Sequence, residues 1–416
     1  MDADVLVVGA GLAGLRCAVA LTNLGRQVTV IEAGDVVGGR VRTDVVDGFR
    51  CDRGFQVLNP AYPAVRRWVD VDALAMQPFG AGVMVRRDDG LSVVADPVRE
   101  PRLLPRTLRS GYLRPVELAA LARWAAHVLV SPRAVMRAPD RTLAQSLDEA
   151  GVTGRIRQEI LEPFLAGVLV DSSGGSSANF AKLLVRMFAL GRPGLPEQGM
   201  GALPAQLAAR LPEVRLGTPV EAVIADGGRG VAVVAGASRW HARAVVVATD
   251  PVTAARLTPL PVPATKGLVT WWFEAPQAPS RLPLIAVDGR GAGGRRHGPV
   301  WNTSVISAAA PSYAPAGRHL VEATCLLDRP DGDAPEADVL RHGGEIYGGG
   351  TAGWRTIIRH RIPLALPVMP PPLRPRSAVS LGDGVFVCGD HRDTRSIQGA
   401  LVSGDRTAVV VHAALA

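Results

Sequence analysis

Apolar and polar positions at the start of the chain alternate between strand and helix patterns. Residues 4–8 form a short apolar run that ends at Gly9, which is typical of a buried parallel strand. Apolar positions over residues 12–24 recur at helical spacing up to Gly25, a residue that commonly ends a helix. Residues 27–31 form a second apolar run. The pattern predicts a strand–helix–strand unit.

The middle of the chain changes to helical spacing. From about residue 97 to 190 the pattern is mostly helical, with a long apolar helix expected over residues 115–130 and a shorter one over residues 141–150. Thr142 can cap the shorter helix, and Gln145 three residues later completes a capping box. Further helices are expected over residues 155–164 and 178–190.

Strand patterns return near residue 199. Gly227-Gly228, between two apolar runs, indicates a hairpin turn, and the proline-rich residues 363–375 indicate a connector. Helices are expected over residues 203–211 and, last in the chain, 397–415. Strands are expected over residues 214–216, 220–225, 231–235, 244–248 and 385–388, and strands of a second sheet over residues 269–273 and 320–327.

Composition narrows the functional classes. Hydrophobic residues make up 47% of the chain and charged residues 20%, the profile of a folded globular protein. The net charge of +8 comes almost entirely from arginine, because the lysines are Lys182 and Lys266 alone. The arginines are scattered and aromatic residues make up only 5%, so nucleic acid is not an expected partner.

Cysteine usage and hydropathy bear on the compartment. The four cysteines form no CxxC pair, so we expect reduced thiols and a cytoplasmic protein. No signal-type segment opens the chain, and no run reaches the roughly 20 apolar residues of a membrane span. Residues 102–123 interleave arginine with Leu, Tyr and Trp, which suits a solvated face or a peripheral contact with an anionic membrane.

A glycine-rich motif, GAGLAG at residues 9–14, follows the first predicted strand. Gly9 permits a tight turn, Gly11 lets a pyrophosphate approach the backbone, and Gly14 lets helix and strand pack closely. The phosphates would lie at the helix N-terminus, where free N–H groups favour anions. Glu32 ends the second strand, and its carboxylate suits the two hydroxyls of an adenosine ribose. Together these features predict a dinucleotide site.

A second glycine pair follows Glu32. Gly38 and Gly39 let a loop pass close to a cofactor, and Arg40 can donate to phosphate oxygens. The stretch VVGAGLAGLRCAVAL…VTVIEAGDVVGGRVRT resembles the superfamily of flavin-containing amine oxidases, protoporphyrinogen oxidases and phytoene desaturases. The DRG at residues 52–54 resembles the DxG that follows in these enzymes. The resemblance implies FAD rather than NAD.

The C-terminal stretch VFVCGD…SIQGA resembles the flavin motif of the same superfamily. The resemblance implies that Gly389 and Asp390 contact the pyrophosphate and ribityl chain. It also implies a helix beginning near Ile397 whose N-terminus faces the flavin, where reduction builds negative charge. By the same resemblance, the cofactor-binding residues include Leu12, Ala13, Ala33, Val220, Ser396, Gln398 and Ala400.

Several positions depart from the family pattern or stay open. Ser396 stands where the amine oxidases carry an aromatic residue in front of the flavin, which argues against a standard amine oxidase. Cys388 is expected inside a strand, which indicates non-covalent FAD. Lys266 stands roughly where those oxidases carry a catalytic lysine near flavin N5, or it is a surface lysine before a strand. The aromatic residues 271–273 line a pocket or belong to the core.

The resemblance implies an α/β fold with a Rossmann-type, GR2-like FAD-binding domain. An inserted substrate domain of mixed sheet and helices completes it. We expect the FAD-binding domain to be discontinuous, over residues 1–75, 199–255 and 376–416, and the substrate domain to occupy residues 76–198 and 256–375.

The implied activity is removal of a hydride from a small organic substrate, apolar or amine-type, with electrons passing on to oxygen or another acceptor. No metal is expected, because the flavin carries the chemistry. The missing aromatic residue and the apolar helical insert favour a desaturase or dehydrogenase of an apolar substrate. Two alternatives remain: a flavin-dependent isomerase, and a flavin-free lipid carrier like the GDP-dissociation inhibitors.

Overall fold

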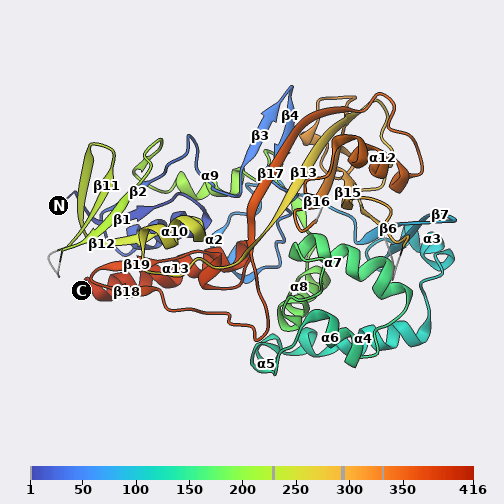
Figure 1. The fold of residues 1–416 in the computed structure, drawn as a ribbon, viewed down its shortest axis with the longest axis horizontal. Helices are drawn as coiled ribbons and strands as arrows, with labels where there is room; N and C mark the ends of the chain where they lie inside the picture. Colours follow the sequence, from blue (N-terminus) through green and yellow to red (C-terminus); the bar gives the residue numbers. More distant parts are fainter. Residues whose placement is uncertain (1, 227–229, 292–295, 330–331) are drawn as a thin grey trace.

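The computed structural model describes residues 2–226, 230–291, 296–329 and 332–416, so the turn predicted at Gly227-Gly228 lies outside the described residues. Its fold is α/β with two large sheets (Figure 1). The first sheet has the order β10-β11-β12-β1-β2-β9, and β19 pairs with β12 and with β18. Its strands are β1 (Ala3–Val8), β2 (Val28–Ile31), β9 (Val214–Arg215), β10 (Ala222–Ala225), β11 (Val231–Ala235), β12 (Ser238–Val247), β18 (Ser380–Gly382) and β19 (Val385–Val387).

The strands predicted for this sheet are confirmed, most within two residues. β1 runs parallel to both β2 and β12, and its apolar side chains are buried on both faces, as an apolar run of this length predicts. β12 begins six residues earlier than expected because it also pairs antiparallel with β11. Val220 precedes β10 instead of belonging to it.

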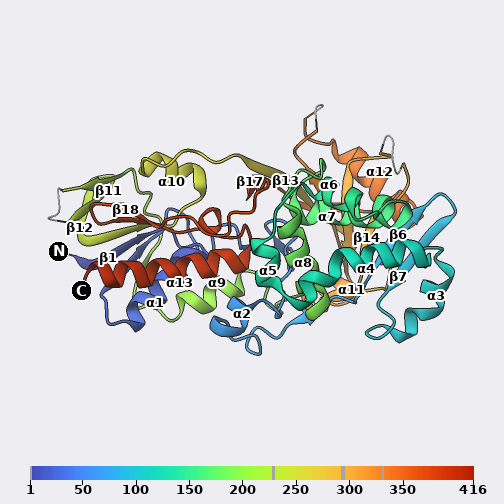
Figure 2. The same ribbon diagram turned by 90° about the horizontal axis from the view of Figure 1, so that it is seen from below.

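Helices cover both faces of the first sheet. One face carries α1 (Leu12–Asn23) and α13 (Ile397–Ala414), with α9 (Ala202–Ala208) and α2 (Pro63–Trp68) beside them. The other carries α10 (Pro251–Leu257). A Cβ on Gly404 would lie 2.2 Å from the Ala13 carbonyl oxygen, so α13 crosses α1 in backbone contact. Figure 2 shows α13 running from the C-terminus towards the middle of the molecule.

The second sheet has seven strands in the order β17-β13-β16-β15-β14-β6-β7. The strands predicted over 269–273 and 320–327 are confirmed as β13 and β16. The sequence did not predict β6, β7, β14, β15 or β17. The strands are β6 (Gly82–Arg87), β7 (Gly90–Ala95), β13 (Thr265–Ala275), β14 (Ile285–Asp288), β15 (Val300–Val305), β16 (His319–Leu326) and β17 (Arg355–Pro367).

The connector predicted over residues 363–375 is wrong for its first five residues. They end the long strand β17, which pairs with β13 at the edge of the second sheet. Pro363 lacks an N–H donor, but an edge strand leaves one side of its ladder unpaired and therefore tolerates proline. The chain becomes an extended connector only after Pro367.

A group of helices lies below the second sheet in Figure 1. The predicted helix over 115–130 is confirmed at those bounds as α4, and Thr142 and Gln145 form the predicted capping box on α6. Residues 156–161 form a π-helix that leads into α7. The helices are α3 (Leu104–Arg109), α4 (Pro115–Val130), α5 (Pro132–Arg137), α6 (Leu143–Glu149), α7 (Glu162–Leu169) and α8 (Ala178–Leu190).

Smaller elements connect or cover the two sheets. They are the hairpin β3 (Thr43–Val46) and β4 (Phe49–Asp52), the pair β5 (Gln77–Pro78) and β8 (Gly194–Leu195), and the helices α11 (Ile306–Ala309) and α12 (Glu336–Tyr347). Short 3-10 turns occupy Pro101–Leu103, Pro311–Tyr313 and Asp390–Arg392. Among the helices of the described residues, none is long and apolar enough to cross a bilayer.

Strand membership supports the expected division of the chain. The first sheet draws its strands from residues 1–75, 199–255 and 376–416, and the second from residues 76–198 and 256–375. We keep these ranges as a proposal for the two domains.

Candidate functional site

The glycines of residues 9–14 have different surroundings. A Cβ on Gly9 would lie 2.8 Å from the Ala248 carbonyl oxygen, and a Cβ on Gly14 would lie 2.0 Å from the Gly9 carbonyl oxygen. A Cβ on Gly11 would meet nothing within 4 Å. Gly11 precedes α1, whose N-terminus has no side-chain cap. The turn therefore leaves open space in front of free N–H groups, the arrangement that a pyrophosphate requires.

Glu32 is held beside this turn. Its Oε2 accepts from the Ala10 N–H at 2.7 Å, and its Oε1 accepts from the Gly34 N–H at 2.8 Å. The Glu32 carbonyl accepts from the Thr218 N–H at 2.8 Å, which brings the segment before β10 to the end of β2. Val220 follows there, buried in one apolar cluster with Ile31. The predicted ribose and adenine residues thus lie together.

The other residues predicted around the turn differ in exposure. Leu12 and Ala13 are buried in the first turn of α1, where only their backbone can face a ligand. Ala33 is exposed. A contact between the backbone of these residues and a ligand does not depend on their side chains.

The second glycine pair approaches the first motif. The Gly38 N–H donates to the Ala10 carbonyl at 2.8 Å, and Gly38 forms a bridge with Gly11. A Cβ on Gly39 would lie 3.5 Å from the Gly11 Cα. The two loops therefore form one backbone cradle, which we define as residues 9–14 and 38–40.

Arg40, the last residue of the cradle, links it to Asp390 and to β17 of the second sheet. Its guanidinium contacts the Asp390 carboxylate at 2.6 Å and donates to the Ala365 carbonyl of β17 at 3.0 Å. Burial raises the pKa of the Asp390 carboxyl, but the Arg40 guanidinium outweighs it and holds that pKa below its usual value. The sequence predicted that Arg40 contacts phosphates. In the structure its guanidinium forms an ion pair with a carboxylate.

Three residues that the sequence did not indicate as site residues carry buried polar atoms without a hydrogen-bond partner in the described part of the chain. Both ring nitrogens of His391, Oε1 of Gln56 and Nε of Arg395 are such atoms. Gln56 also donates to the Arg40 carbonyl at 3.0 Å. Burial lowers the pKa of His391 to about 4, which favours a neutral ring. Buried polar groups normally have partners, so these atoms suit a bound polar cofactor.

The start of α13 is built by capping. Ser396 accepts from the Gly399 N–H at 3.1 Å, so this serine is an N-cap residue. Gln398 Oε1 accepts from the Ala64 N–H at 2.8 Å, which commits that oxygen to α2. Ile397 and Ala400 are half-buried, and Gly389 is buried with a φ of 153°.

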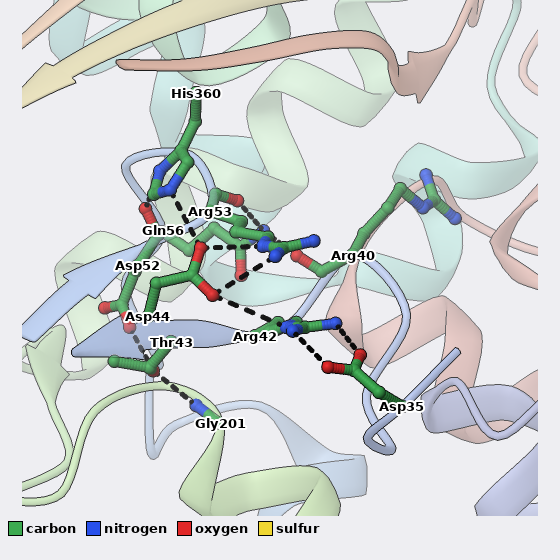
Figure 3. Close-up of polar contacts among 10 residues, drawn as sticks. All are labelled: Asp35, Arg40, Arg42, Thr43, Asp44, Asp52, Arg53, Gln56, Gly201 and His360. Atoms are coloured by element: carbon green, nitrogen blue, oxygen red, sulfur yellow. Dashed lines mark hydrogen bonds and ion pairs between the residues drawn. The ribbon is translucent and has the colours of Figure 1, made fainter. Parts of the chain in front are cut away.

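A polar network beside the cradle links the β3–β4 hairpin to the second sheet (Figure 3). His360 of β17 lies between the Asp44 carboxylate, 2.9 Å from Nε2, and the Asp52 carbonyl, 3.1 Å from Nδ1. Arg53 forms an ion pair with Asp44 at 2.8 Å. Burial raises the pKa of Asp52 to about 6, although Thr43 and other donors oppose the shift. The network fixes β17 over the loop that carries Gln56.

The alternative prediction that Lys266 is a surface lysine before a strand is wrong. It is the second residue of β13, and its Nζ lies 2.6 Å from Asp171 Oδ1. Burial raises the pKa of Asp171, but Lys266 and nearby serine hydroxyls outweigh it and hold that pKa at about 2. Lys266 pairs with Leu366, the neighbour of the Arg40-bound Ala365.

The aromatic residues 271–273 divide between the faces of β13. Trp271 and Phe273 stack within one apolar core cluster, and Trp272 is buried in another on the opposite face of β13, so all three belong to the core.

Comparison with known proteins identifies this architecture. The profile of the family of flavin containing amine oxidoreductases matches residues 12–412. The phytoene dehydrogenase of Streptomyces griseus is 56% identical over 54 residues, 13% of this chain and 11% of that protein. The putrescine oxidase of Kocuria rosea is 44% identical over 70 residues, 17% of this chain and 15% of that protein. These matched segments span less than a sixth of the relatives' length.

A solved structure covers far more of the chain. An oxidoreductase of Methanosarcina mazei has a TM-score of 0.74 at 16% identity, covering 96% of this chain and 98% of that one, which shows a shared fold. The family match and this shared fold agree with each other. The chain belongs to the family of flavin-containing amine oxidoreductases. This membership favours neither the isomerase nor the flavin-free carrier.

Proposed function

We propose that this protein oxidises a small organic substrate that has an apolar body, at a site between the cradle and the second sheet. The open space at Gly11, beside Glu32 and the Arg40–Asp390 pair, carries the proposal. The residues proposed to hold FAD are Gly9, Gly11, Leu12, Ala13, Gly14, Glu32, Ala33, Gly38, Gly39, Arg40, Val220, Gly389, Asp390, Ser396, Ile397, Gln398 and Ala400, with Gln56, His391 and Arg395 added from their unpaired atoms.

An apolar cluster on the second sheet supports an apolar substrate body. Ala166 and Val170, at the end of α7, pack against Leu268 of β13 and Leu326 of β16. A Cβ on Gly54 would lie 3.9 Å from Leu268, so the loop after β4 reaches the same cluster. When bound, FAD supplies the hydride acceptor. The chain's own contribution is to exclude water and orient the substrate.

Lys266 is proposed as the residue that governs protons at this cluster. Its ammonium is held by Asp171, which directly follows Val170. A lysine fixed in this way can hold a water or donate a hydrogen bond to the substrate.

Non-covalent attachment of FAD is part of the proposal. All four cysteines are buried, and Cys388 lies directly after β19 and not inside a strand as expected. The absorbance spectrum of the purified protein tests this mode of attachment. Bands at about 370 and 450 nm should appear in the supernatant after heat denaturation. A panel of amines and apolar compounds should then include one that bleaches the bands without oxygen. A protein that stays colourless after incubation with FAD would contradict the function.

We further propose that α3, α4 and α5 rest on an anionic membrane. Eight large apolar side chains are exposed between residues 104 and 136, among them Val116 (82%) and Val130 (86%). Arginines at residues 102, 106, 109, 114 and 123 lie among them, which suits anionic lipid. Co-sedimentation with phosphatidylglycerol vesicles should fall after Val116→Asp with Val130→Asp and be weaker with neutral phosphatidylcholine vesicles. Equal binding to both vesicles would contradict this contact.

A further inference from the structure

A cavity of about 570 Å³ lies at one end of the second sheet, outside the cradle. It opens between the loop that follows β13, the helix α11 and the first residue of β16. Gln277 and Arg281 of the loop, Ser307 of α11 and His319 of β16 line it with polar groups. Small-molecule sites usually measure roughly 300 to 1,000 Å³, so this cavity can hold an organic ligand.

The cavity is far from the proposed site of oxidation. Lys266 is the second residue of β13, whereas the loop that lines the cavity starts after Ala275, the last residue of that strand. A strand rises about 3.3 Å per residue, so about 30 Å separate the cavity from Lys266. A ligand in the cavity therefore does not compete with the substrate.

Among the described residues that line the cavity, the ionisable ones are Arg281 and His319, and both are basic. Side chains alternate along a strand, so His319 points to the same face as its partner Ala275, and Glu274 points to the other face. The Glu274 carboxylate forms an ion pair with Arg318 there. Arg281 and the His319 ring have no ion-pair or hydrogen-bond partner among the residues that the structure describes. The cavity therefore favours an anion.

Hydrogen-bond donors reach the cavity from three separate segments. Arg281 offers several N–H groups, and the His319 ring adds a donor from β16. Ser307 of α11 keeps its hydroxyl hydrogen free, because its oxygen accepts from the Leu320 N–H at 3.1 Å. The terminal oxygens of a phosphate ester form a tetrahedral set that can accept from all of these segments at once. A planar carboxylate has fewer oxygens, so the donors suit phosphate better.

The loop that lines the cavity is restrained before any ligand binds. Residues 276–283 carry proline at their first, fourth and last positions, and each proline ring fixes its own φ. The Pro283 carbonyl accepts from the Gly80 N–H at 2.8 Å, which ties the end of the loop to the segment before β6. The Ser280 hydroxyl contacts Met84 Sδ of β6 at 3.5 Å. A site that is already formed spends less binding free energy on ordering.

We propose that this cavity binds the phosphate group of a small phosphate ester, with Arg281 as its counter-ion and with Ser307 and His319 as further donors. The side chains of Gln277 and Ser280 then face the polar body of the ester. The proposed site shares no residue with the cradle, so it stands or falls independently of the proposed oxidation.

The test is a calorimetric titration with glycerol 3-phosphate, on protein that has been incubated with FAD and freed of excess FAD. The wild type should bind with a Kd of about 1 mM or less. Arg281→Met keeps the length of the side chain and removes its charge-assisted hydrogen bonds, so Kd should rise about 10-fold or more. Arg239→Met removes an exposed arginine of β12 and should bind like the wild type. No binding to the wild type, or an equal Kd in wild type and Arg281→Met, would overturn the proposal.

Two further titrations test the kind of anion and its source. Acetate should bind about 10-fold more weakly than inorganic phosphate, because it offers fewer acceptor oxygens, and equal affinities would reject the assignment to phosphate. Vesicles of phosphatidic acid test whether the phosphate belongs to a lipid headgroup. Co-sedimentation with these vesicles should be the same for the wild type and Arg281→Met. If Arg281→Met lowers vesicle binding and leaves glycerol 3-phosphate binding unchanged, the soluble ester is rejected in favour of a lipid.

Discussion

The cradle and a row of buried polar residues on the second sheet, the polar row of Thr270, Trp272, Asn302 and Glu322, are built by different means. The cradle is made of backbone: glycines that leave space or permit close contact, and an uncapped helix N-terminus. The polar row is made of side chains that three strands, distant in sequence, bring together. Backbone recognition needs glycine at fixed spacing, which a sequence displays. Side-chain recognition across strands needs only ordinary residues in the right register, which a sequence conceals.

The largest expected effect separates two glycines of the cradle. Gly14→Val should prevent folding, because its Cβ would lie 2.0 Å from the Gly9 carbonyl oxygen. Gly11→Val should fold, because its Cβ meets nothing within 4 Å, but should lose FAD affinity by about 100-fold or more. Circular dichroism and flavin absorbance distinguish the two outcomes. A Gly11→Val protein with full flavin content would show that the pyrophosphate lies elsewhere.

The next effect concerns the link between the cradle and Asp390. Arg40→Met leaves the buried Asp390 carboxylate without its partner, which should cost about 2 to 4 kcal/mol of folding free energy. Urea denaturation measures it. The double variant with Asp390→Asn should recover part of the loss, since the remaining side chain is neutral. If the double variant is no more stable than Arg40→Met, the ion pair is not the cause.

A pH dependence tests the polar network that joins the β3–β4 hairpin to β17. The pKa of Asp52, about 6, is above its ordinary 3.8, so folding favours the protonated form. Its contribution to stability is fully present below pH 3.8 and is lost as pH rises through 6, by up to about 3 kcal/mol. Asp52→Asn removes this dependence. The stability difference between wild type and Asp52→Asn should therefore change between pH 4 and pH 7, and a constant difference would contradict the buried, shifted carboxyl.

The smallest effect compares two helix caps. Ser396→Ala should cost about 1 kcal/mol because the Gly399 N–H loses its acceptor. Thr142→Ala should cost about as much at α6, far from the cradle. Urea denaturation measures both, and flavin absorbance shows whether either changes cofactor content. A large loss of FAD in Ser396→Ala alone would give Ser396 a direct contact with the cofactor beyond capping.

The sequence revealed most of the first sheet and its cradle because local patterns determine them. Apolar runs bounded by glycine marked β1 and β19, and glycine spacing marked the turn at residue 9. The sequence did not predict the edge strand β17, because Pro363 lies within it and proline usually ends a strand. Only the pairing of β17 with β13 shows that the strand continues past this proline. The sequence did not predict His391 as a site residue, because nothing in the neighbouring residues indicates that both of its ring nitrogens are buried. The polar row depends on register, which single residues do not encode.

Flavin absorbance at about 450 nm, measured on the wild type and on Gly11→Val after incubation with FAD and removal of free FAD, tests the central claim, that the cradle binds FAD, most directly. The wild type should keep the band, because Gly11 leaves open space in front of the N-terminus of α1, and Gly11→Val should lose most of it. A wild type that stays colourless, or a Gly11→Val protein with full flavin content, would contradict the claim.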